Sequence, residues 1–270
     1  MSLTVRDLSV TIGQRTILSD ISFSAEPGAI TAIVGPNGSG KSTLLKAICG
    51  EVPYQGQISL NGQSTASLKP WQLAAMRAVL PQASSLAFPF TVREVVQIGL
   101  QAGVAQGERA TVAKALAKFG LSGFEDRFYQ ELSGGEQQRV QMARVLAQVW
   151  QPKLEGQTRW LFLDEPVSSL DIAHQLEVIG VAREYAQGGG GVIAVMHDLN
   201  LTAMCAESVA VMAEGRVLHQ GSPKDTFTDA ILSQAYACQV RVNTPPSADA
   251  VFFLPHAVEA LTPQTTQATA

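Results

Sequence analysis

The spacing of hydrophobic residues changes along this chain and predicts different elements in different parts of it. Near the N-terminus, residues 8–12 and 21–24 alternate apolar and polar side chains, as half-buried strands do. Between about residues 92 and 149 the apolar residues recur at helical spacing, for example at Val112 and Leu116. The sequence therefore predicts an N-terminal β region followed later by a run of helices.

Short continuous apolar runs return after the helical stretch, and such runs are typical of parallel strands buried on both faces. They lie at residues 160–163, 192–196 and 209–212. We therefore expect one domain over residues 1–240 with a C-terminal extension. The expected parts are an α/β core at residues 1–87 and 159–240, a helical insert at residues 88–158, and the extension at residues 241–270. The end of the extension is polar and is predicted to be partly disordered.

Composition narrows the possible classes of protein. The chain has 270 residues, of which 46% are hydrophobic and 16% are charged, as in a globular protein. Its net charge is −4 without a run of Lys or Arg, which argues against a nucleic-acid partner. Neither a signal peptide nor an apolar segment long enough to cross a bilayer is apparent. The three scattered cysteines indicate a reducing compartment, so we predict a cytoplasmic protein that a partner would carry to a membrane.

A glycine-rich loop follows the apolar run at residues 30–34. Residues 35–42 match the phosphate-binding pattern of Gly, four residues, then Gly-Lys-Ser, and a helical pattern begins at Ser42. Glycines let successive backbone N–H groups point toward one anion. We expect Lys41 to neutralise the outer phosphates of a nucleotide and the Ser42 hydroxyl to bind Mg²⁺. The residues predicted here to bind nucleotide are Gly35, Pro36, Asn37, Gly38, Ser39, Gly40, Lys41, Ser42 and Thr43.

Two carboxylates follow the apolar run at residues 160–163. Ligands of open α/β sheets bind at the carboxyl ends of strands, so Asp164 is expected beside the phosphate-binding loop. Asp164 would hold Mg²⁺, directly or through water, and Glu165 would act as the base that polarises the attacking water. An acidic turn at a strand end is common on surfaces, but the phosphate-binding loop in the same chain favours the functional interpretation.

A second anion site is predicted at residues 132–139. Ser133 and Glu136 form a capping box at the start of a helix. Capping does not explain Gly134 and Gly135, because each glycine in a helical turn costs roughly 1 kcal/mol relative to Ala. Close approach of a ligand to the backbone would explain both.

Taken together, these motifs resemble the ATP-binding subunits of ABC transporters over about residues 3–240. The matching segments are the Walker A loop at residues 35–42, the Q-loop at Gln82, the signature motif at residues 132–137, Walker B at residues 160–165, the D-loop at residues 169–171 and the switch at His197. The resemblance implies an α/β fold: a P-loop NTPase (RecA-like) core with an N-terminal antiparallel β region and an inserted α-helical subdomain. It also implies ATP and Mg²⁺ as cofactors.

The resemblance assigns roles to residues that the spacing alone leaves open. It implies that Gln82 binds Mg²⁺ or water and that His197 hydrogen-bonds the γ-phosphate, so that Glu165, His197 and Gln82 are catalytic. It also implies that two copies pair head to tail, each site taking Walker A from one copy and Ser133, Gly134 and Gly135 from the other, and that Asp171 of the D-loop binds nucleotide.

One position departs from the family. Ile12 stands where relatives usually place an aromatic residue that stacks on adenine. An aliphatic contact there would lose a stacking contribution of about 0.5–1.5 kcal/mol. The preference of the site for ATP over GTP is therefore left open by the sequence.

Two segments resemble the ATPases of iron-chelate, haem and cobalamin importers, namely residues 88–96 and 196–203. Residues 151–159 and 240–255 favour the haem branch of this group. The resemblance implies two separate transmembrane permease subunits and a periplasmic haem-binding protein as partners, at the cytoplasmic face of the bacterial inner membrane. Siderophore or cobalamin import is the alternative. A soluble ABC-type ATPase lacks support from a coiled coil or basic surface, and a small-molecule kinase would give residues 133–135 no use.

Overall fold

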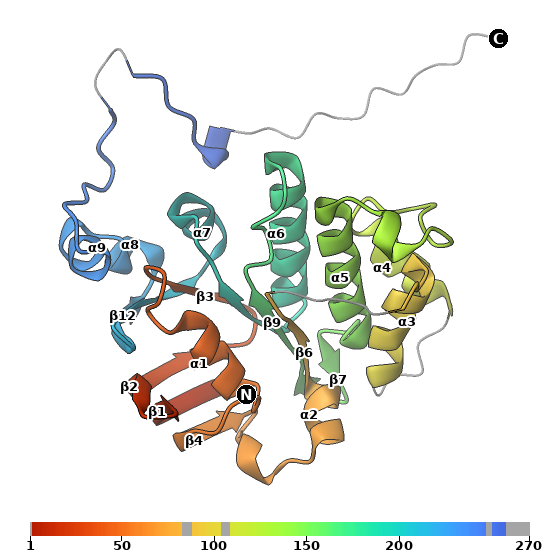
Figure 1. Cartoon of the computed structure of the whole chain (residues 1–270), viewed down its shortest axis with the longest axis horizontal. Coiled ribbons are helices and arrows are strands. Elements are labelled where there is room, and N and C mark those ends of the chain that lie inside the picture. Colours follow the sequence, from red (N-terminus) through yellow and green to blue (C-terminus); the bar gives the residue numbers. More distant parts are fainter. Residues whose placement is uncertain (1, 83–87, 104–108, 247–249, 258–270) are drawn as a thin grey trace.

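The apolar runs of the sequence form a central six-stranded sheet (Figure 1). In spatial order its strands are β12 (Arg216–Gly221), β11 (Ser208–Ala213), β3 (Ile30–Val34), β10 (Gly191–Val195), β9 (Trp160–Asp164) and β6 (Arg77–Leu80). Neighbouring strands from β11 to β6 are parallel, and β12 alone runs antiparallel to its neighbour. This computed structural model describes residues 2–82, 88–103, 109–246 and 250–257.

The N-terminal residues form a second, antiparallel sheet. Its strands, in spatial order, are β2 (Arg15–Ala25), β1 (Leu3–Ile12), β4 (Gln55–Leu60) and β5 (Gln63–Ser64). Burial alternates along β1 and β2, as the alternating sequence predicts. Helix α1 (Lys41–Ile48) lies between this sheet and the central sheet, and the apolar side chains of both sheets pack around it (Figure 1).

Two hydrophobic cores cover the two faces of the central sheet. In β9, Leu161 and Leu163 belong to one core, whereas Trp160 and Phe162 belong to the other. This division follows from the two-residue period of a strand, which sends successive side chains to opposite faces. A strand buried on both faces needs an unbroken apolar run, and that is the pattern seen in the sequence.

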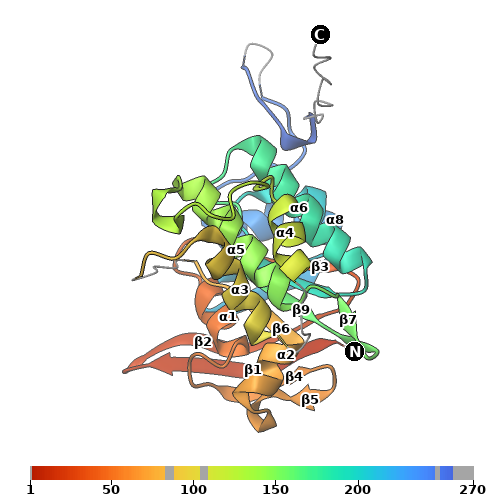
Figure 2. The same ribbon diagram turned by 90° about the vertical axis from the view of Figure 1, so that its right-hand side faces the viewer.

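Helices fill the sequence between β6 and β9 and cover one core (Figure 2). Those in this stretch are α3 (Val92–Ala102), α4 (Arg109–Ala117), the short η2 (Tyr129–Glu131) and α5 (Gly134–Gln148), followed by the hairpin β7 (Lys153–Leu154) and β8 (Gln157–Thr158). Figures 1 and 2 both show α3, α4 and α5 grouped at one side of the molecule. The remaining helices are η1 (Thr65–Ser67), α2 (Pro70–Met76), α6 (Ile172–Gln187), α7 (Leu199–Cys205), α8 (Pro223–Thr226), α9 (Asp229–Tyr236) and η3 (Pro255–Ala257).

The predicted fold class is confirmed: an α/β core follows an antiparallel β region, and helices interrupt it. The domain boundaries, at residues 87/88, 158/159 and 240/241, stay predictions. The tail predicted to be disordered, residues 262–270, lies outside the described residues. Among the described helices, none has both the length and the apolar character needed to cross a membrane.

Parallel strands place their carboxyl ends at one edge of the sheet, and that arrangement decides where the site lies. The phosphate-binding loop follows β3, Gln82 follows β6, Glu165 follows β9, and His197 follows β10. Four segments that are far apart in the sequence therefore meet at this edge.

Candidate functional site

The loop between β3 and α1 has a conformation that only glycine fits at two positions. Gly40 has a φ of +99°, and a Cβ atom there would lie 2.5 Å from Cδ2 of Leu18 on β2. Gly35 has a φ of +150°, and a Cβ atom there would collide with the carbonyl oxygen of Met212 on β11. The loop is therefore packed tightly against neighbours from both sheets, which holds its backbone in place.

Lys41 closes over this loop from the first turn of α1. Its ammonium donates hydrogen bonds to the carbonyl oxygens of Gly35 at 2.8 Å and Pro36 at 3.0 Å. The side chain is buried, and desolvation lowers the pKa of its ammonium, against the opposing charges of Glu165 and Asp164. A phosphate bound in the loop would replace these two neutral carbonyl acceptors by a negatively charged one, which binds the ammonium more strongly.

Ser42 and Asp164 place two oxygens together beside the loop. The Ser42 hydroxyl donates to Oδ1 of Asp164 at 3.3 Å. Burial raises the pKa of the Asp164 carboxyl, although the Ser42 hydrogen bond opposes the shift. A hydroxyl and a carboxylate are ligands that suit Mg²⁺, which keeps few protein ligands and takes the rest of its shell from phosphate and water. These two residues therefore fit the expected ion. Among the described residues, no cluster of three or more His, Cys, Asp or Glu is placed to hold a metal ion on its own.

Glu165, Gln82 and His197 form a hydrogen-bonded group at the same edge. β9 and β10 are neighbours, and Asp164 pairs in register with Val195, so the residues that follow the two strands lie side by side. Oε1 of Glu165 accepts a hydrogen bond from Nε2 of Gln82 at 3.0 Å and lies 2.6 Å from Nε2 of His197. Glu165 has a φ of +52°, an uncommon backbone conformation for a non-glycine residue. The structure thus brings together three residues that are widely separated in the sequence.

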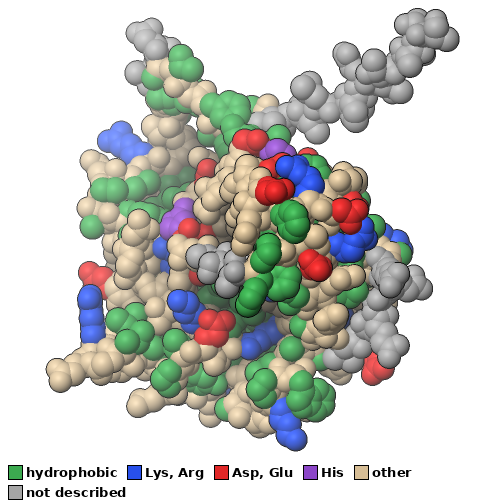
Figure 3. All heavy atoms as spheres, turned by 45° about the vertical axis from the view of Figure 1, so that its right-hand side comes forward, with side chains coloured by type: hydrophobic (Ala, Val, Ile, Leu, Met, Phe, Trp, Pro, Cys, Tyr) green, Lys and Arg blue, Asp and Glu red, His purple; other side chains and the backbone are tan. Residues whose placement is uncertain are grey.

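A cavity of about 790 Å³ opens between this group, the loop and the N-terminal sheet. Its lining residues are Arg15, Ile17, Asn37, Gly38, Gly40, Lys41, Ser42, Thr43, Gln82, Glu165 and His197. Six of the nine loop residues predicted to bind nucleotide therefore share one cavity with the three predicted catalytic residues. The face drawn in the space-filling view carries hydrophobic, acidic, basic and histidine side chains (Figure 3).

Some residues predicted to belong to the site do not line the cavity. Gly35, Pro36, Ser39 and Asp164 are not among its lining residues. Ser39 is buried, and its hydroxyl has no hydrogen-bond partner among the described residues. Asp164 reaches the site through its hydrogen bond to Ser42.

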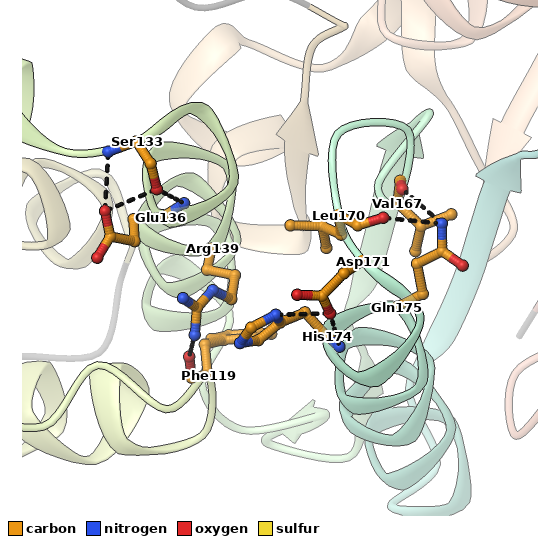
Figure 4. Close-up of polar contacts among 9 residues, drawn as sticks. All are labelled: Phe119, Ser133, Glu136, Arg139, Val167, Leu170, Asp171, His174 and Gln175. Atoms are coloured by element: carbon orange, nitrogen blue, oxygen red, sulfur yellow. Dashed lines mark hydrogen bonds and ion pairs between the residues drawn. The ribbon is translucent and has the colours of Figure 1, made fainter. Parts of the chain in front are cut away.

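Ser133 caps the start of α5, and Gly134 and Gly135 are the first two residues of that helix. Figure 4 shows Ser133 at this helix start. Ser133 and Glu136 make the predicted capping box: the Ser133 N–H donates to Oε2 of Glu136 at 2.8 Å, and the Glu136 N–H donates to the Ser133 hydroxyl at 3.3 Å. A Cβ atom on Gly134 would meet nothing within 4 Å, so the fold of one chain gives no steric reason for this glycine. None of these residues lines the cavity.

Asp171, the last residue of the D-loop, caps the start of α6 (Figure 4). Its Oδ1 accepts a hydrogen bond from the His174 N–H at 3.0 Å and lies 2.8 Å from Nδ1 of the His174 ring. These two bonds lower the pKa of the Asp171 carboxyl. Nearby, Nε2 of Gln175 donates to the carbonyl oxygens of Val167 and Leu170, which fixes the turn before α6. Asp171 also lies outside the lining of the cavity.

The sequence analysis missed two residues of the cavity wall, Arg15 and Ile17. It considered Ile12 instead, and Ile12 is 54% exposed and is not among the lining residues. Pairing of β1 with β2 sets Arg15 opposite Ile12 across the turn at Gly13. The glycine between two alternating segments was the signal that could have located this hairpin.

Comparison with known proteins agrees with the geometry. The family model described as "ABC transporter" matches residues 18–168. The chain is 63% identical to the "Hemin import ATP-binding protein HmuV" of Jannaschia sp. (strain CCS1), over 94% of each chain. It is 58% identical to the protein of the same name from Roseobacter denitrificans, over 97% of this chain and 100% of the relative. A solved structure of the ATP-binding subunit of an ABC transporter superposes with a TM-score of 0.75 at 25% identity, over 88% of this chain and 96% of the other.

Proposed function

The chain belongs to the ABC transporter family, and from this premise we propose that it is the ATP-hydrolysing subunit of a haem importer. The observation that carries the proposal is the high identity, over nearly the whole chain, to relatives named for hemin import. The proposed partners are a second copy of this chain, two transmembrane permease subunits and, indirectly, a periplasmic haem-binding protein. The chain would act as a peripheral protein at the cytoplasmic face of a bacterial inner membrane.

The residues of the cavity can perform ATP hydrolysis. Backbone N–H groups of the loop and the start of α1 bind the phosphates, and Lys41 neutralises their outer oxygens. Glu165 accepts a proton from the attacking water, and His197 hydrogen-bonds the γ-phosphate. In the present structure Gln82 and His197 both contact Glu165. When the γ-phosphate and the attacking water bind, they would replace these contacts.

Ser42, Asp164 and Gln82 are the residues that would hold Mg²⁺. When bound, the ion supplies positive charge that offsets the charge developing on the phosphate oxygens. Asp164 is suited to this role because its buried carboxylate has one hydrogen-bond donor, Ser42, among the described residues.

The separation of the signature motif from the cavity supports a two-copy site. Ser133, Gly134 and Gly135 start a helix whose N–H groups can bind an anion, yet the cavity of the same chain lies elsewhere. In a head-to-tail pair with two-fold symmetry, each motif would face the phosphate-binding loop of the other copy. ATP would then hold the pair together, and hydrolysis would release it.

An exposed aromatic surface supports the permease partner. Phe88 is 69% exposed and contacts the half-buried Phe90 edge to face, and Phe128 nearby is 45% exposed. Phe88 lies six residues after Gln82 in the sequence. Val92, which follows shortly after Phe90, is fully buried and belongs to the core, so it is not part of this surface.

Trapping the closed pair tests the nucleotide mechanism. In Glu165→Gln, ATP should bind while hydrolysis falls by at least about 100-fold, because the base is lost. Size-exclusion chromatography with ATP and Mg²⁺ should then show a dimer that persists, whereas ADP gives a monomer. A small-molecule kinase would not dimerise in this way, and that result would contradict the proposal.

Transport assays test the cargo. The chain, purified with its native permease and placed in proteoliposomes, should take up haem in an ATP-dependent manner. A ferric siderophore and cobalamin serve as matched alternatives in the same vesicles. Uptake of either of these without uptake of haem would keep the transport function and overturn haem as the cargo.

A further inference from the structure

We propose that Arg15 is a specificity-determining residue of the nucleotide site: its guanidinium plane stacks on the purine base. The inference rests on the proposed nucleotide function and adds the part of the site that binds the base. Arg15 lines the cavity together with Ile17, Asn37 and the phosphate-binding loop.

The fold holds Arg15 at a defined position relative to the phosphates. Arg15 is the first residue of β2, directly after the turn that contains Gly13, and pairs with Ile12. Farther along β2, Leu18 packs against Gly40 of the loop, at a distance that leaves no room for a Cβ atom. The Ser39 carbonyl also accepts a hydrogen bond from Gly215, whose own carbonyl accepts one from Ser19 of β2. The strand and the loop are therefore joined as one unit.

The side chain of Arg15 is free to contact a ligand. It is exposed and makes no hydrogen bond or ion pair with any of the described residues. The catalytic group of Gln82, Glu165 and His197 comes from the carboxyl ends of the central strands, whereas Arg15 and Ile17 come from the N-terminal sheet. With the γ-phosphate beside the catalytic group, the rest of the nucleotide extends along the remaining wall. Arg15 and the aliphatic Ile17 are the side chains that this wall offers to a flat ring.

The chemistry of a guanidinium predicts which bases the site accepts. A guanidinium is planar and delocalised, so it stacks on an aromatic face and is attracted by the π electrons. Adenine and guanine both present such a face. A stacked guanidinium does not read the hydrogen-bonding edge by which the two bases differ. We therefore expect ADP and GDP to bind with affinities within about three-fold of each other.

Calorimetric titration of the full chain with ADP, GDP and pyrophosphate, all with Mg²⁺, tests the inference. Arg15→Ala should lower the affinity for ADP and GDP by about two- to five-fold, as expected for an exposed cation–π contact. The affinity for pyrophosphate should stay unchanged within experimental error. Arg15→Lys keeps the charge but loses the plane, so it should recover only part of the nucleotide affinity that Arg15→Ala loses. Arg15→Tyr restores a flat ring and should recover nucleotide affinity. Arg6→Ala, at an exposed position of β1, is the matched control and should change nothing.

The outcomes separate this inference from the proposed function. Equal losses for pyrophosphate and nucleotides in Arg15→Ala would mean that Arg15 acts as a charge on the phosphates, and the stacking role would be overturned. Full nucleotide affinity in Arg15→Lys would also overturn stacking, because the flat guanidinium would then not be needed. Nucleotide binding that is unchanged in Arg15→Ala would overturn it as well. If the unaltered chain binds none of the three ligands, the nucleotide site itself is wrong, and both proposals fail together.

Discussion

Asp164 shows at the scale of single residues how function and stability conflict. Its side chain is 3% exposed, and desolvation raises the pKa of its carboxyl above the ordinary value of 3.8. The folded chain therefore binds this proton more tightly than the unfolded chain does. Stability is lost as the pH rises from the ordinary pKa through the raised one, so the ionised carboxylate destabilises the nucleotide-free protein at neutral pH.

Replacing this carboxylate should therefore stabilise the chain and inactivate it. We expect Asp164→Asn to raise the thermal midpoint at pH 7 by about 2 °C, because the amide carries no charge to desolvate. The gain should shrink as the pH is lowered toward 4, where the carboxyl also becomes neutral. ATPase activity should fall about 100-fold. Calorimetry from pH 4 to pH 8 measures the change in the thermal midpoint, and Asp126→Asn, with a side chain that is 89% exposed, is the control. A lower midpoint for Asp164→Asn at pH 7 would contradict the argument.

At the scale of elements, two helices begin with the same cap but are predicted to differ in function. In α3 the Thr91 hydroxyl accepts from the Glu94 N–H at 3.3 Å, and in α5 the Ser133 hydroxyl accepts from the Glu136 N–H at 3.3 Å. In both, the acidic side chain accepts from the N–H of the cap residue at 2.8 Å. The two caps should therefore contribute similarly to stability, at about 1 kcal/mol each.

This matched pair separates capping from ligand binding. We expect Thr91→Ala and Ser133→Ala each to lower the thermal midpoint by about 2–4 °C. Only Ser133→Ala should also lose ATPase activity, because its hydroxyl is proposed to face the nucleotide of the second copy. Both variants are measured as isolated chains, so the permease cannot affect the ATPase activity. Equal ATPase activity in the two variants would reduce Ser133 to a capping residue.

At the scale of the whole molecule, the proposed site is complete only in a pair of chains. Specific ATPase activity should therefore rise with protein concentration until dimers saturate. Gly135→Asp should abolish this activity, because it adds negative charge where the phosphates of the other copy would bind, and should leave ADP binding to the monomer intact. Activity is measured over a dilution series, and calorimetry follows ADP. Full activity at high dilution, or unchanged turnover in Gly135→Asp, would contradict the two-copy site.

Several features of this protein were readable in the sequence because they depend on residues close to one another along the chain. The mainly apolar runs at β3 and β9 predicted strands buried on both faces, since neither face of such a strand is turned to water. The phosphate-binding loop and the capping box at Ser133 are also local, because backbone conformation and capping involve neighbours within a few positions.

Other features depended on contacts between distant segments, and only the tertiary structure decided them. The sequence suggested that Ile12 contacts the adenine ring of the nucleotide. In the structure, the turn at Gly13 and the packing of β2 on Gly40 place Arg15 and Ile17, and not Ile12, in the cavity wall. The shared hydrogen bonding of Glu165 likewise depends on the side-by-side order of β6, β9 and β10. Strand order arises from the free energy of burying the whole sheet between two cores, and no local pattern in this chain encodes it.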